Sequence, residues 1–389
     1  MSQNAPRPLF PAEAPEPAPE ADFSTGILPS QAIREAVERG EILATEPIDE
    51  DQIQPASLDL RLGAYAYRVP ASFLPGRDAT VGQKVERFAM HRIELADGAV
   101  LERDGVYIVP LMESLRLKRR TSAIANPKSS TGRLDIFARV ITDHGFEFDH
   151  IREAYRGPLW CEISPRSFSV LVRTGSRLVQ LRIKRGSPLT TQSALERLHE
   201  QVGLVDVETD DASLKRGKLS FSVNTEPSRD SEVIGYRAKK NAFLIDLDKE
   251  DHYDPLDFWE PILARPGRPL ILDPNDFYIL GSRESVTVPP DHAAEMLAFD
   301  TLVGEFRVHY AGFFDPGFGH DAAGGSGAKA VLEVRSRDVP FVLEHGQVVG
   351  RLCFERLTAR PDKLYGLNIG SNYQRQGLAL SKQFRRARP

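Results

Sequence analysis

Apolar and polar residues alternate along much of the chain with a period of two. Leucine occupies every second position over residues 58–62, and Gly63 ends the run. The same alternation recurs over residues 168–172, ahead of a turn at Thr174-Gly175. Successive side chains of a strand point to opposite faces of a sheet, so this period predicts strands. We therefore predict a mainly β chain.

Helical periodicity is confined to short stretches. Ser30 is a suitable N-cap, the apolar residues of Ile33–Val37 fall on one helical face, and Gly40 is a suitable end. A weaker helical pattern covers Gln192–Val202. We predict a short helix at each place, the second as a link between the two halves of the chain.

The two halves of the chain resemble each other at a fixed offset of 171 residues. Identical pairs at this offset are Leu101 with Leu272, Tyr107 with Tyr278, Ile108 with Ile279, Glu162 with Glu333, Arg166 with Arg337, Gly175 with Gly346 and Leu181 with Leu352. Apolar positions between them agree in kind. One offset maintained over so long a stretch indicates a duplicated domain.

The length of the chain agrees with a duplication, because 389 residues are too many for one ordinary core and suit two. We predict a first domain over residues 26–190 (the first copy), a linker over 191–202 and a second domain over 203–389 (the second copy). Residues 1–25 are rich in Pro, Ala and Glu. Such a segment buries too little apolar surface to offset its ordering entropy, so we predict a disordered tail.

Charge and composition exclude several classes of protein. The net charge of −5 argues against a nucleic-acid-binding surface. No apolar run approaches the ~20 residues of a membrane span, and the N-terminus has no secretory signal pattern. We therefore expect a cytoplasmic protein with neither nucleic acid nor membrane as a partner. The two cysteines, Cys161 and Cys353, are too few for a disulfide framework or a cysteine-rich zinc site.

A compact group of hydrogen-bond donors lies at Lys128–Arg133, with the sequence Lys-Ser-Ser-Thr-Gly-Arg. An arginine offers a bidentate fork to phosphate, and serine hydroxyls offer short O–H donors. Lys128, Ser129, Ser130 and Arg133 are therefore candidates to hold a phosphate chain. The alternative is an ordinary polar turn on the surface.

A glycine- and proline-rich segment at Ala311–Gly319 predicts a hairpin whose backbone can approach a flat ring closely. Phe318 could stack on a base or sugar, and Asp315 could accept a hydrogen bond from an amino group or a hydroxyl. The alternative is a plain β-turn with an aspartate at its corner.

Glu162 and Glu333 each lie in an apolar, strand-like run. A carboxyl group with apolar neighbours tends to have a raised pKa, which suits general acid–base catalysis near neutral pH. The alternative is an outward-facing strand residue. Because both copies keep the glutamate in register, we favour a functional role for at least one.

Several common catalytic signatures are absent from the sequence. It contains neither a P-loop nor the nucleophile elbow of the α/β-hydrolases. The zinc-deaminase signature, His-x-Glu with Pro-Cys-x-x-Cys, is also missing.

The run Gln52–Gly63, with the sequence Gln-Ile-Gln-Pro-Ala-Ser-Leu-Asp-Leu-Arg-Leu-Gly, resembles the N-terminal motif of the dCTP deaminase family. Ser129–Arg133 resembles the family's Ser-Ser-x-x-Arg phosphate motif, and Ala311–Gly319 resembles its base-recognition hairpin, which dUTPases share. Glu333 and Glu162 both fall where the family keeps its catalytic glutamate. The residues that resemble its nucleotide-covering tail are Tyr365, Tyr373, Gln374, Gln376 and Gly377.

This resemblance implies an all-β fold of two tandem dUTPase-like domains, each a distorted barrel or jelly roll, with a few short helices. It also implies a homo-oligomer that binds dCTP and a nucleotide product, with a C-terminal lid over about 365–380. The residues implied for catalysis are Glu333, Glu162, Arg133 and Ser129. The residues implied for substrate binding are Lys128, Ser130, Ala311, Asp315, Phe318, Tyr365, Tyr373 and Gln376.

The sequence departs from the family pattern in ways that complement each other. Family members are usually single-domain chains that trimerise, with the site between neighbouring subunits. In this chain the second copy has Asp300 and Gly304 in place of Ser129 and Arg133, and the first copy lacks a clean Asp-Pro-Gly hairpin. We therefore expect composite sites, with phosphate contacts from the first copy and base contacts plus lid from the second.

The two glutamates should not be equivalent, and we favour Glu333 over Glu162. In this fold the hairpin leads into the strand that carries the glutamate. The clean hairpin precedes Glu333, whereas the stretch Asp149–Gly157 ahead of Glu162 is bulkier and more charged. Against this, Glu162 shares a copy with Ser129 and Arg133.

The resemblance implies hydrolytic deamination of dCTP to dUTP and ammonia. We expect no required cofactor: no zinc, and magnesium only as the ion that a triphosphate carries. One alternative is dUTP diphosphatase activity, alone or after deamination, since the fold and hairpin are shared. Another is a nucleotide-binding protein without catalysis, which the divided motifs permit.

Overall fold

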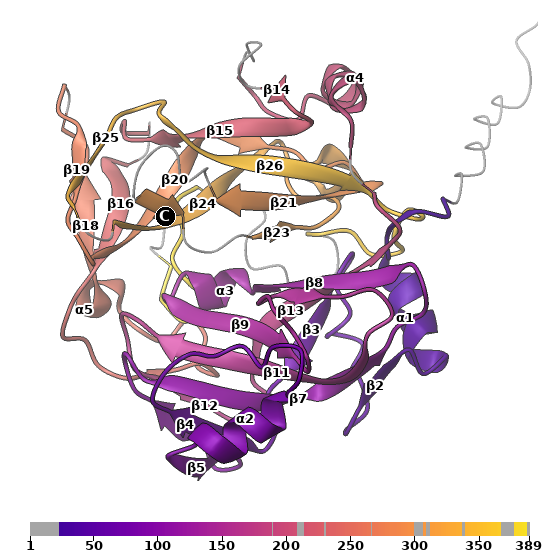
Figure 1. The fold of residues 1–389 in the computed structure, drawn as a ribbon. Coiled ribbons are helices and arrows are strands. Elements are labelled where there is room, and N and C mark those ends of the chain that lie inside the picture. The colour runs from indigo at the N-terminus through magenta and orange to yellow at the C-terminus, as the bar shows by residue number, and fades with distance from the viewer. Residues whose placement is uncertain are drawn as a thin grey trace, which may run out of the picture.

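The computed structural model describes residues 23–188, 190–207, 214–228, 231–265, 267–298, 306–308, 312–336, 339–366 and 377–386 (Figure 1). Ala311, Tyr373 and Gln376 lie outside these ranges, as do Asp300, Gly304 and most of the N-terminal segment. The described chain is mainly β, as the alternating pattern predicts.

The first copy contributes thirteen of the described strands. They are β1 (Gly26–Ile27), β2 (Ile42–Ala44), β3 (Leu58–Arg61), β4 (Tyr65–Val69), β5 (His91–Glu94), β6 (Ala99–Leu101), β7 (Val106–Arg116), β8 (Thr121–Pro127), β9 (Ile136–Thr142), β10 (His150–Ile151), β11 (Arg156–Pro165), β12 (Val170–Val172) and β13 (Arg177–Arg185). Most lie in two sheets, ordered β1-β13-β8-β10 with β3 beside β13, and β5-β4-β7-β11-β9 with β2 beside β7.

The second copy contributes the remaining described strands. They are β14 (Leu214–Lys215), β15 (Lys218–Asn224), β16 (Val233–Ala238), β17 (Ile245–Asp246), β18 (Trp259–Leu263), β19 (Leu270–Leu272), β20 (Phe277–Val286), β21 (His292–Ala298), β22 (Phe306–Val308), β23 (Phe313–Phe314), β24 (Ala328–Ser336), β25 (Phe341–Leu343) and β26 (Val348–Arg356). Their main sheet follows the path β18-β16-β20-β15-β26-β21-β23, with β24 beside β20. In both copies the described sheets are distorted and do not close into barrels.

The internal repeat is confirmed strand by strand. The strands β6, β8, β12 and β13 have the same bounds as β19, β21, β25 and β26 after a shift of 171 residues. The two glutamates occupy matching places, since Glu162 pairs with Ile108 across β11 and β7, and Glu333 pairs with Ile279 across β24 and β20. The duplication in sequence is therefore a duplication of fold.

The helices are short: α1 (Ser30–Glu38), α2 (Val81–Phe88), α3 (Ser129–Gly132), α4 (Gln192–Val202), α5 (Pro255–Phe258) and the 3₁₀ helix η2 (Asp321–Ala323). Both predicted helices are present, but Ser30 is not the N-cap of α1. That position belongs to Pro29, and the Ser30 hydroxyl donates to Asp362 instead. No helix within the described ranges is long and apolar enough to cross a membrane.

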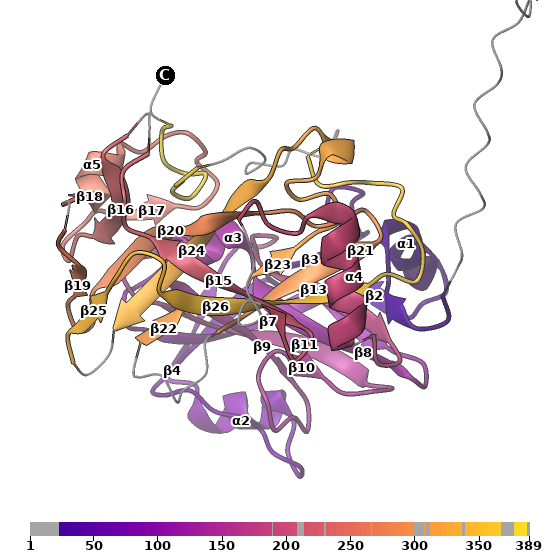
Figure 2. The ribbon, with the colours of Figure 1, turned by 90° about the horizontal axis from the view of Figure 1, so that it is seen from above.

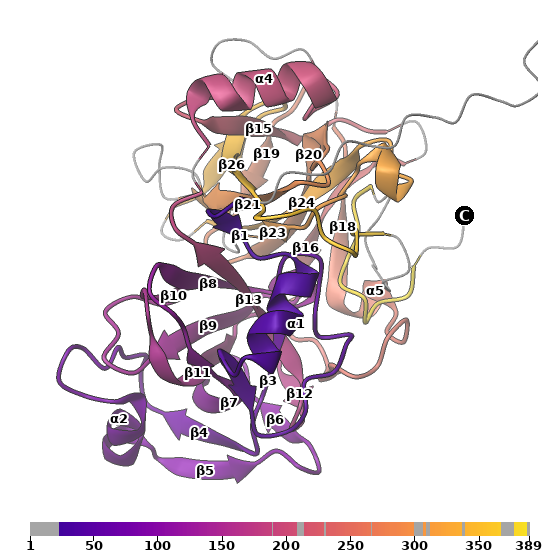
Figure 3. The ribbon, with the colours of Figure 1, turned by 90° about the vertical axis from the view of Figure 1, so that its right-hand side faces the viewer.

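Helix α4 packs on one copy only, with Leu195 buried in the core of the second copy. Figures 1 and 3 show α4 on the side of the second copy that faces away from the first. The position of α4 in the sequence suggests a linker between the two copies. Its packing instead shows that it covers the core of the second copy.

The two copies are stacked on one another and share structure across their boundary (Figures 1 and 2). Strand β17 of the second copy pairs in parallel with β12 of the first. Near the C-terminus, Phe384 packs its ring 5.9 Å from Trp259, whose indole lies 5.3 Å from Phe168 of the first copy. The boundary between the copies is therefore part of a continuous hydrophobic core.

Candidate active site

The first copy contributes a cationic segment around α3. Lys128 precedes this short helix and Arg133 follows it. Ser130 and Arg133 are buried, at 9% and 6% exposure, so the alternative of a surface turn is wrong. The Lys128 ammonium pairs with the Asp59 carboxylate on β3. Hydroxyl and cationic donors are thus held in a confined place, as a phosphate site requires.

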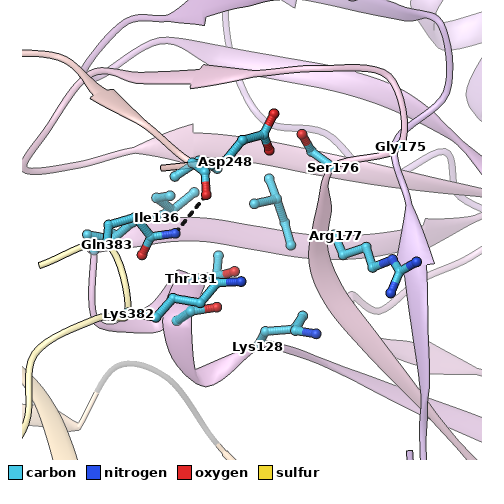
Figure 4. A pocket seen from close by; sticks show the side chains of 13 residues that line it. Lys128, Thr131, Ile136, Gly175, Ser176, Arg177, Asp248, Lys382 and Gln383 are labelled. Atoms are coloured by element: carbon cyan, nitrogen blue, oxygen red, sulfur yellow. Dashed lines mark hydrogen bonds between the residues drawn. The ribbon is translucent and has the colours of Figure 1, made fainter. Parts of the chain in front are cut away.

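A pocket of 270 Å³ opens beside this segment, and Figure 4 shows the side chains that line it. Lys128 and Ser130 line it from the first copy together with Arg177, and Lys382 comes from the second copy. These three cations outnumber Asp248, the carboxylate in the lining. Each of these cations is paired with a carboxylate outside the lining, so an anionic ligand would have to share or displace these partners.

Sequence reasoning did not find Arg177 and Lys382. Arg177 follows a turn into β13 and pairs with Asp51 at 3.0 Å, and Lys382 pairs with Glu250 at 2.5 Å. A cation after a turn or near a chain end is common on any surface. Only the folded chain, which brings the C-terminal segment back onto the first copy, makes these residues neighbours of Lys128.

The C-terminal segment also touches the phosphate segment directly. Arg133 Nη1 donates to the carbonyl oxygen of Ala379 at 3.1 Å. The Ser381 hydroxyl donates to the carbonyl of Ser130 at 2.7 Å and is itself 2% exposed. The end of the chain is therefore anchored against the same residues that are candidates to bind phosphate.

Glu333 lies on β24 with its side chain almost fully buried. Burial raises the pKa of this carboxyl from 4.5 to about 8, although the positive charge of Arg133 in the first copy lowers it. Among the described residues, no other side chain donates a hydrogen bond to the Glu333 carboxyl or forms an ion pair with it. Glu333 therefore combines a raised pKa with a carboxyl group whose described hydrogen bond is to its own backbone.

Glu162, the matching glutamate of the first copy, has a different environment. Its Oε1 accepts a hydrogen bond from Arg139 Nη2 at 2.5 Å. The Arg139 guanidinium in turn lies 3.5 Å from the centre of the Phe148 ring. The charge of Glu162 is thus compensated within its own copy, and the compensating cation is stacked in place.

The hairpin of the second copy is buried against the first copy. Asp315 Oδ1 accepts from Arg182 Nη2 at 3.1 Å, and its carboxyl group is close enough to Asp59 and Lys128 to feel their charges. The Phe318 ring lies 5.6 Å from the ring of Tyr365, whose backbone N–H donates to the Pro316 carbonyl at 2.8 Å. The start of the predicted lid therefore packs on the hairpin.

The run Gln52–Gly63 has a structural role that its sequence does not reveal. Glu113 on β7 is fully buried, and its carboxylate accepts from Arg61 Nε at 2.8 Å and from Gln52 Nε2 at 3.1 Å. A buried, fully bonded network of this kind fixes one arrangement of the chain. Here it fixes β3 against β7, and so places Asp59 where it meets Lys128.

The described residues contain no group of three or more His, Cys, Asp and Glu side chains placed to hold a metal ion. Cys161 is buried, and burial raises the pKa of its thiol well above the usual value. The Cys353 thiol has a raised pKa for the same reason. A raised thiol pKa lowers the fraction of reactive thiolate.

Comparison with known proteins agrees with this architecture. A sequence model of the 2'-deoxycytidine 5'-triphosphate deaminase N-terminal domain matches residues 24–187, and one of the C-terminal domain matches residues 191–384. The crystal structure of 2'-deoxycytidine 5'-triphosphate deaminase from Agrobacterium tumefaciens superposes with a TM-score of 0.82 and 55% identity, covering 86% of this chain and 99% of that one.

Shorter relatives match less than half of this chain. The dCTP deaminase, dUMP-forming, of Kocuria rhizophila is 32% identical over 180 residues, which is 43% of this chain and 88% of the relative. The protein of the same name from Clavibacter michiganensis is 36% identical over 175 residues, 42% of this chain and 82% of its own. The fold and these matches define a β protein of two tandem dUTPase-like domains. The chain belongs to the dCTP deaminase family.

Proposed function

We propose that this protein catalyses the hydrolytic deamination of dCTP at a site formed by both copies. The first copy supplies phosphate contacts through Lys128, Ser129, Ser130 and Arg133. The second copy supplies Glu333 and the hairpin with Asp315 and Phe318. Membership of the family supports the reaction, and the charges that act between the copies, from Arg133 on Glu333 and from Lys128 on Asp315, support the composite site.

The observation that carries the assignment of the catalytic residue is the contrast between the two glutamates. Glu333 has a pKa of about 8 and lies near the cationic Arg133, whereas Glu162 is paired with Arg139. A general acid–base catalyst needs a pKa close to the working pH and a carboxyl group that can reach the reacting atoms. Glu333 meets the first requirement, and its carboxyl is not committed to another side chain.

In the proposed mechanism the ionised Glu333 carboxylate takes a proton from a water molecule, whose oxygen attacks C4 of cytosine. The proton passes to ring N3, which gives a tetrahedral intermediate with both a hydroxyl and an amino group on C4. The carboxylate then moves the hydroxyl proton to the amino group, the C4–N bond breaks, and ammonia leaves. The overall change is dCTP plus water to dUTP plus ammonia.

The test is to incubate the purified protein with dCTP and with dUTP and to separate the products. Ammonia and dUTP from dCTP support the proposal. Binding of dCTP without any product would instead support the alternative of a nucleotide-binding protein without catalysis.

A second candidate function is formation of dUMP, because two of the relatives carry the name dCTP deaminase, dUMP-forming. Hydrolysis of the α–β phosphoanhydride after deamination would release pyrophosphate. Pyrophosphate in the same incubation, in step with ammonia, would therefore identify a bifunctional enzyme. Pyrophosphate from dUTP without ammonia from dCTP would identify a diphosphatase.

We propose that the reaction needs no zinc, and that magnesium takes part only as the ion that the triphosphate carries. Turnover should survive prolonged dialysis against a zinc chelator when magnesium is present. Loss of turnover that only added zinc restores would contradict this prediction.

We also propose a cytoplasmic homo-oligomer whose partners are dCTP and its product. Light scattering on the purified chain measures the assembly, and a single-chain mass at all concentrations would contradict the oligomer. Cell fractionation tests the location.

A further inference from the structure

Arg182, in the middle of β13 of the first copy, is a charged residue with no exposed surface. It lies between Leu181 and Ile183, which are also buried. Placing a guanidinium in such surroundings costs several kcal/mol in lost hydration unless other groups compensate for it. The groups that contact the Arg182 guanidinium therefore indicate its role.

The described contacts of the Arg182 guanidinium come from the second copy. Nη1 donates to the carbonyl of Ala294 at 2.9 Å. Nη2 donates to Asp315 Oδ1 at 3.1 Å and to the carbonyl of Phe314 at 3.4 Å. The guanidinium carbon lies 4.0 Å from the centre of the Phe313 ring. One planar group thus contacts three consecutive residues of the hairpin and the strand beside it.

These contacts fix the position of the hairpin. Phe314 packs edge-on against Phe318 at 5.0 Å between ring centres, and the backbone N–H of Phe318 donates to the Asp315 carbonyl at 3.1 Å. A shift of residues 313–315 would therefore move Phe318 as well. A rigid arginine fork constrains a backbone more strongly than a flexible lysine does.

The same contacts set the charge of Asp315. Burial raises the pKa of this carboxyl, and the positive charge of Arg182 lowers it. An ionised carboxylate only accepts hydrogen bonds, whereas a protonated one also presents a donor. Arg182 therefore favours the form of Asp315 that can accept from a hydroxyl or amino group of a nucleotide.

We infer that Arg182 is a positioning residue through which the first copy holds the second copy's hairpin for nucleotide binding. The inference rests on the proposed function. According to this inference, strand β13 contributes to the affinity for substrate through Arg182, in addition to its structural role. The inference concerns nucleotide affinity and leaves the chemical step at Glu333 unchanged.

The test compares Arg182→Met with Lys184→Met. Lys184 is two residues further along the same strand, so it lies on the same face, and it also bridges the copies through Glu355 at 2.8 Å. Its described ion pairs are with Glu355 on β26 and Glu295 on β21, and none is with the described hairpin residues 312–319. For Arg182→Met we expect the KM for dCTP to rise roughly tenfold to a hundredfold, with a smaller change in kcat. Lys184→Met should keep the wild-type KM.

The pH dependence of KM distinguishes this role from a purely structural one. If Arg182 were only structural, its replacement would leave the pH profile of KM unchanged. The positive charge of Arg182 lowers the pKa of Asp315, so without Arg182 the pKa of this carboxyl should rise further. The KM of Arg182→Met should therefore fall as pH rises, more steeply than that of the wild type. Equal pH profiles for folded wild type and Arg182→Met would overturn the inference, as would an equal loss of affinity in Lys184→Met.

If Arg182→Met does not fold, Arg182→Lys decides the question, because it keeps the charge and loses the fork. Its KM should rise at least severalfold, and an unchanged KM would overturn the inference. Direct calorimetric titration of dCTP into variants that also carry Glu333→Gln measures affinity without turnover. Failure of the wild type to deaminate dCTP would count against the proposed function, whereas normal affinity in the Arg182 variants would count against this inference alone.

Discussion

At the scale of single residues, the two glutamates share a position in the repeat and differ in their surroundings. Glu162 has a stacked arginine as its partner, whereas Glu333 is buried with the charge of Arg133 nearby. Burial disfavours the ionised form of a carboxyl group, which is why the pKa of Glu333 is raised to about 8. The difference arises from neighbours that are remote in sequence.

We predict that Glu333→Gln abolishes deamination and that Glu162→Gln retains most of it. Glutamine keeps the shape of the side chain and removes the proton exchange. The measurement is kcat for each variant, with circular dichroism to confirm folding. A loss of only severalfold in Glu333→Gln beside a collapse in Glu162→Gln would reverse the assignment.

The raised pKa of Glu333 predicts a pH dependence of both activity and stability. As a base, Glu333 must be ionised, so kcat/KM should rise with pH and level off above about 8. Its folded pKa lies above the unfolded value of 4.5, so its contribution to stability is present below pH 4.5 and is lost as pH rises to about 8.

Denaturant titrations of the wild type and Glu333→Gln between pH 5 and pH 9 check the second part. The unfolding free energy of the wild type should fall relative to that of the variant over this range. Asp149, whose pKa burial raises to about 7, contributes a change of the same sign to both proteins and therefore cancels. A constant difference between the two proteins would contradict the assignment.

We predict that Arg133→Ala lowers kcat/KM for dCTP about ten- to a hundredfold, which is the loss of about 1.5–3 kcal/mol for a charge-assisted phosphate contact. The fold should survive. Arg237→Ala is the control, since Arg237 is part of an exposed ion pair with Glu260 in the second copy. Wild-type kinetics in Arg133→Ala would show that this arginine does not bind substrate.

Part of the candidate site could be predicted because the residues lie close together in the sequence. Lys128, Ser130 and Arg133 form one short run, and chemical type alone marks them as phosphate donors. Arg182 carries a weaker signal, a lone arginine between apolar strand residues, and it was missed. The partner that explains it, Asp315, lies in the other copy.

At the scale of elements, strands were predictable where one face is buried. The alternation over residues 168–172 corresponds to β12 and the turn that follows it. In β3, by contrast, polar as well as apolar side chains are buried, because Asp59 pairs with Lys128 and Arg61 pairs with the fully buried Glu113. Period alone does not distinguish a polar side chain that faces solvent from one that faces a buried partner.

We predict that Tyr365→Ala raises the KM for dCTP severalfold, because Tyr365 packs on Phe318 and begins the segment proposed to cover the nucleotide. Hydrogen exchange over residues 365–380 should slow when nucleotide binds. Phe88→Ala is the control: its ring packs against Phe73 in a separate apolar cluster of the first copy, so it should lower stability and leave the KM unchanged. Equal exchange with and without nucleotide would contradict the lid.

At the scale of the whole molecule, the duplication was visible in the sequence, but the way in which the copies join was not. The offset of 171 residues identifies equivalent strands, and the structure confirms them. The parallel pairing of β17 with β12 has no counterpart in any local pattern. Such contacts depend on how two finished domains fit together, which local periodicity does not encode.

The proposed division of the site between covalently joined copies has a consequence for how the protein behaves on dilution. Arg133 and Glu333 belong to one polypeptide, so the linker sets their effective concentration. A site divided between separate subunits is lost when the subunits dissociate. Here each chain carries both halves of the proposed site. For the same reason, mixing an Arg133 variant with a Glu333 variant would regenerate no intact site within any single chain.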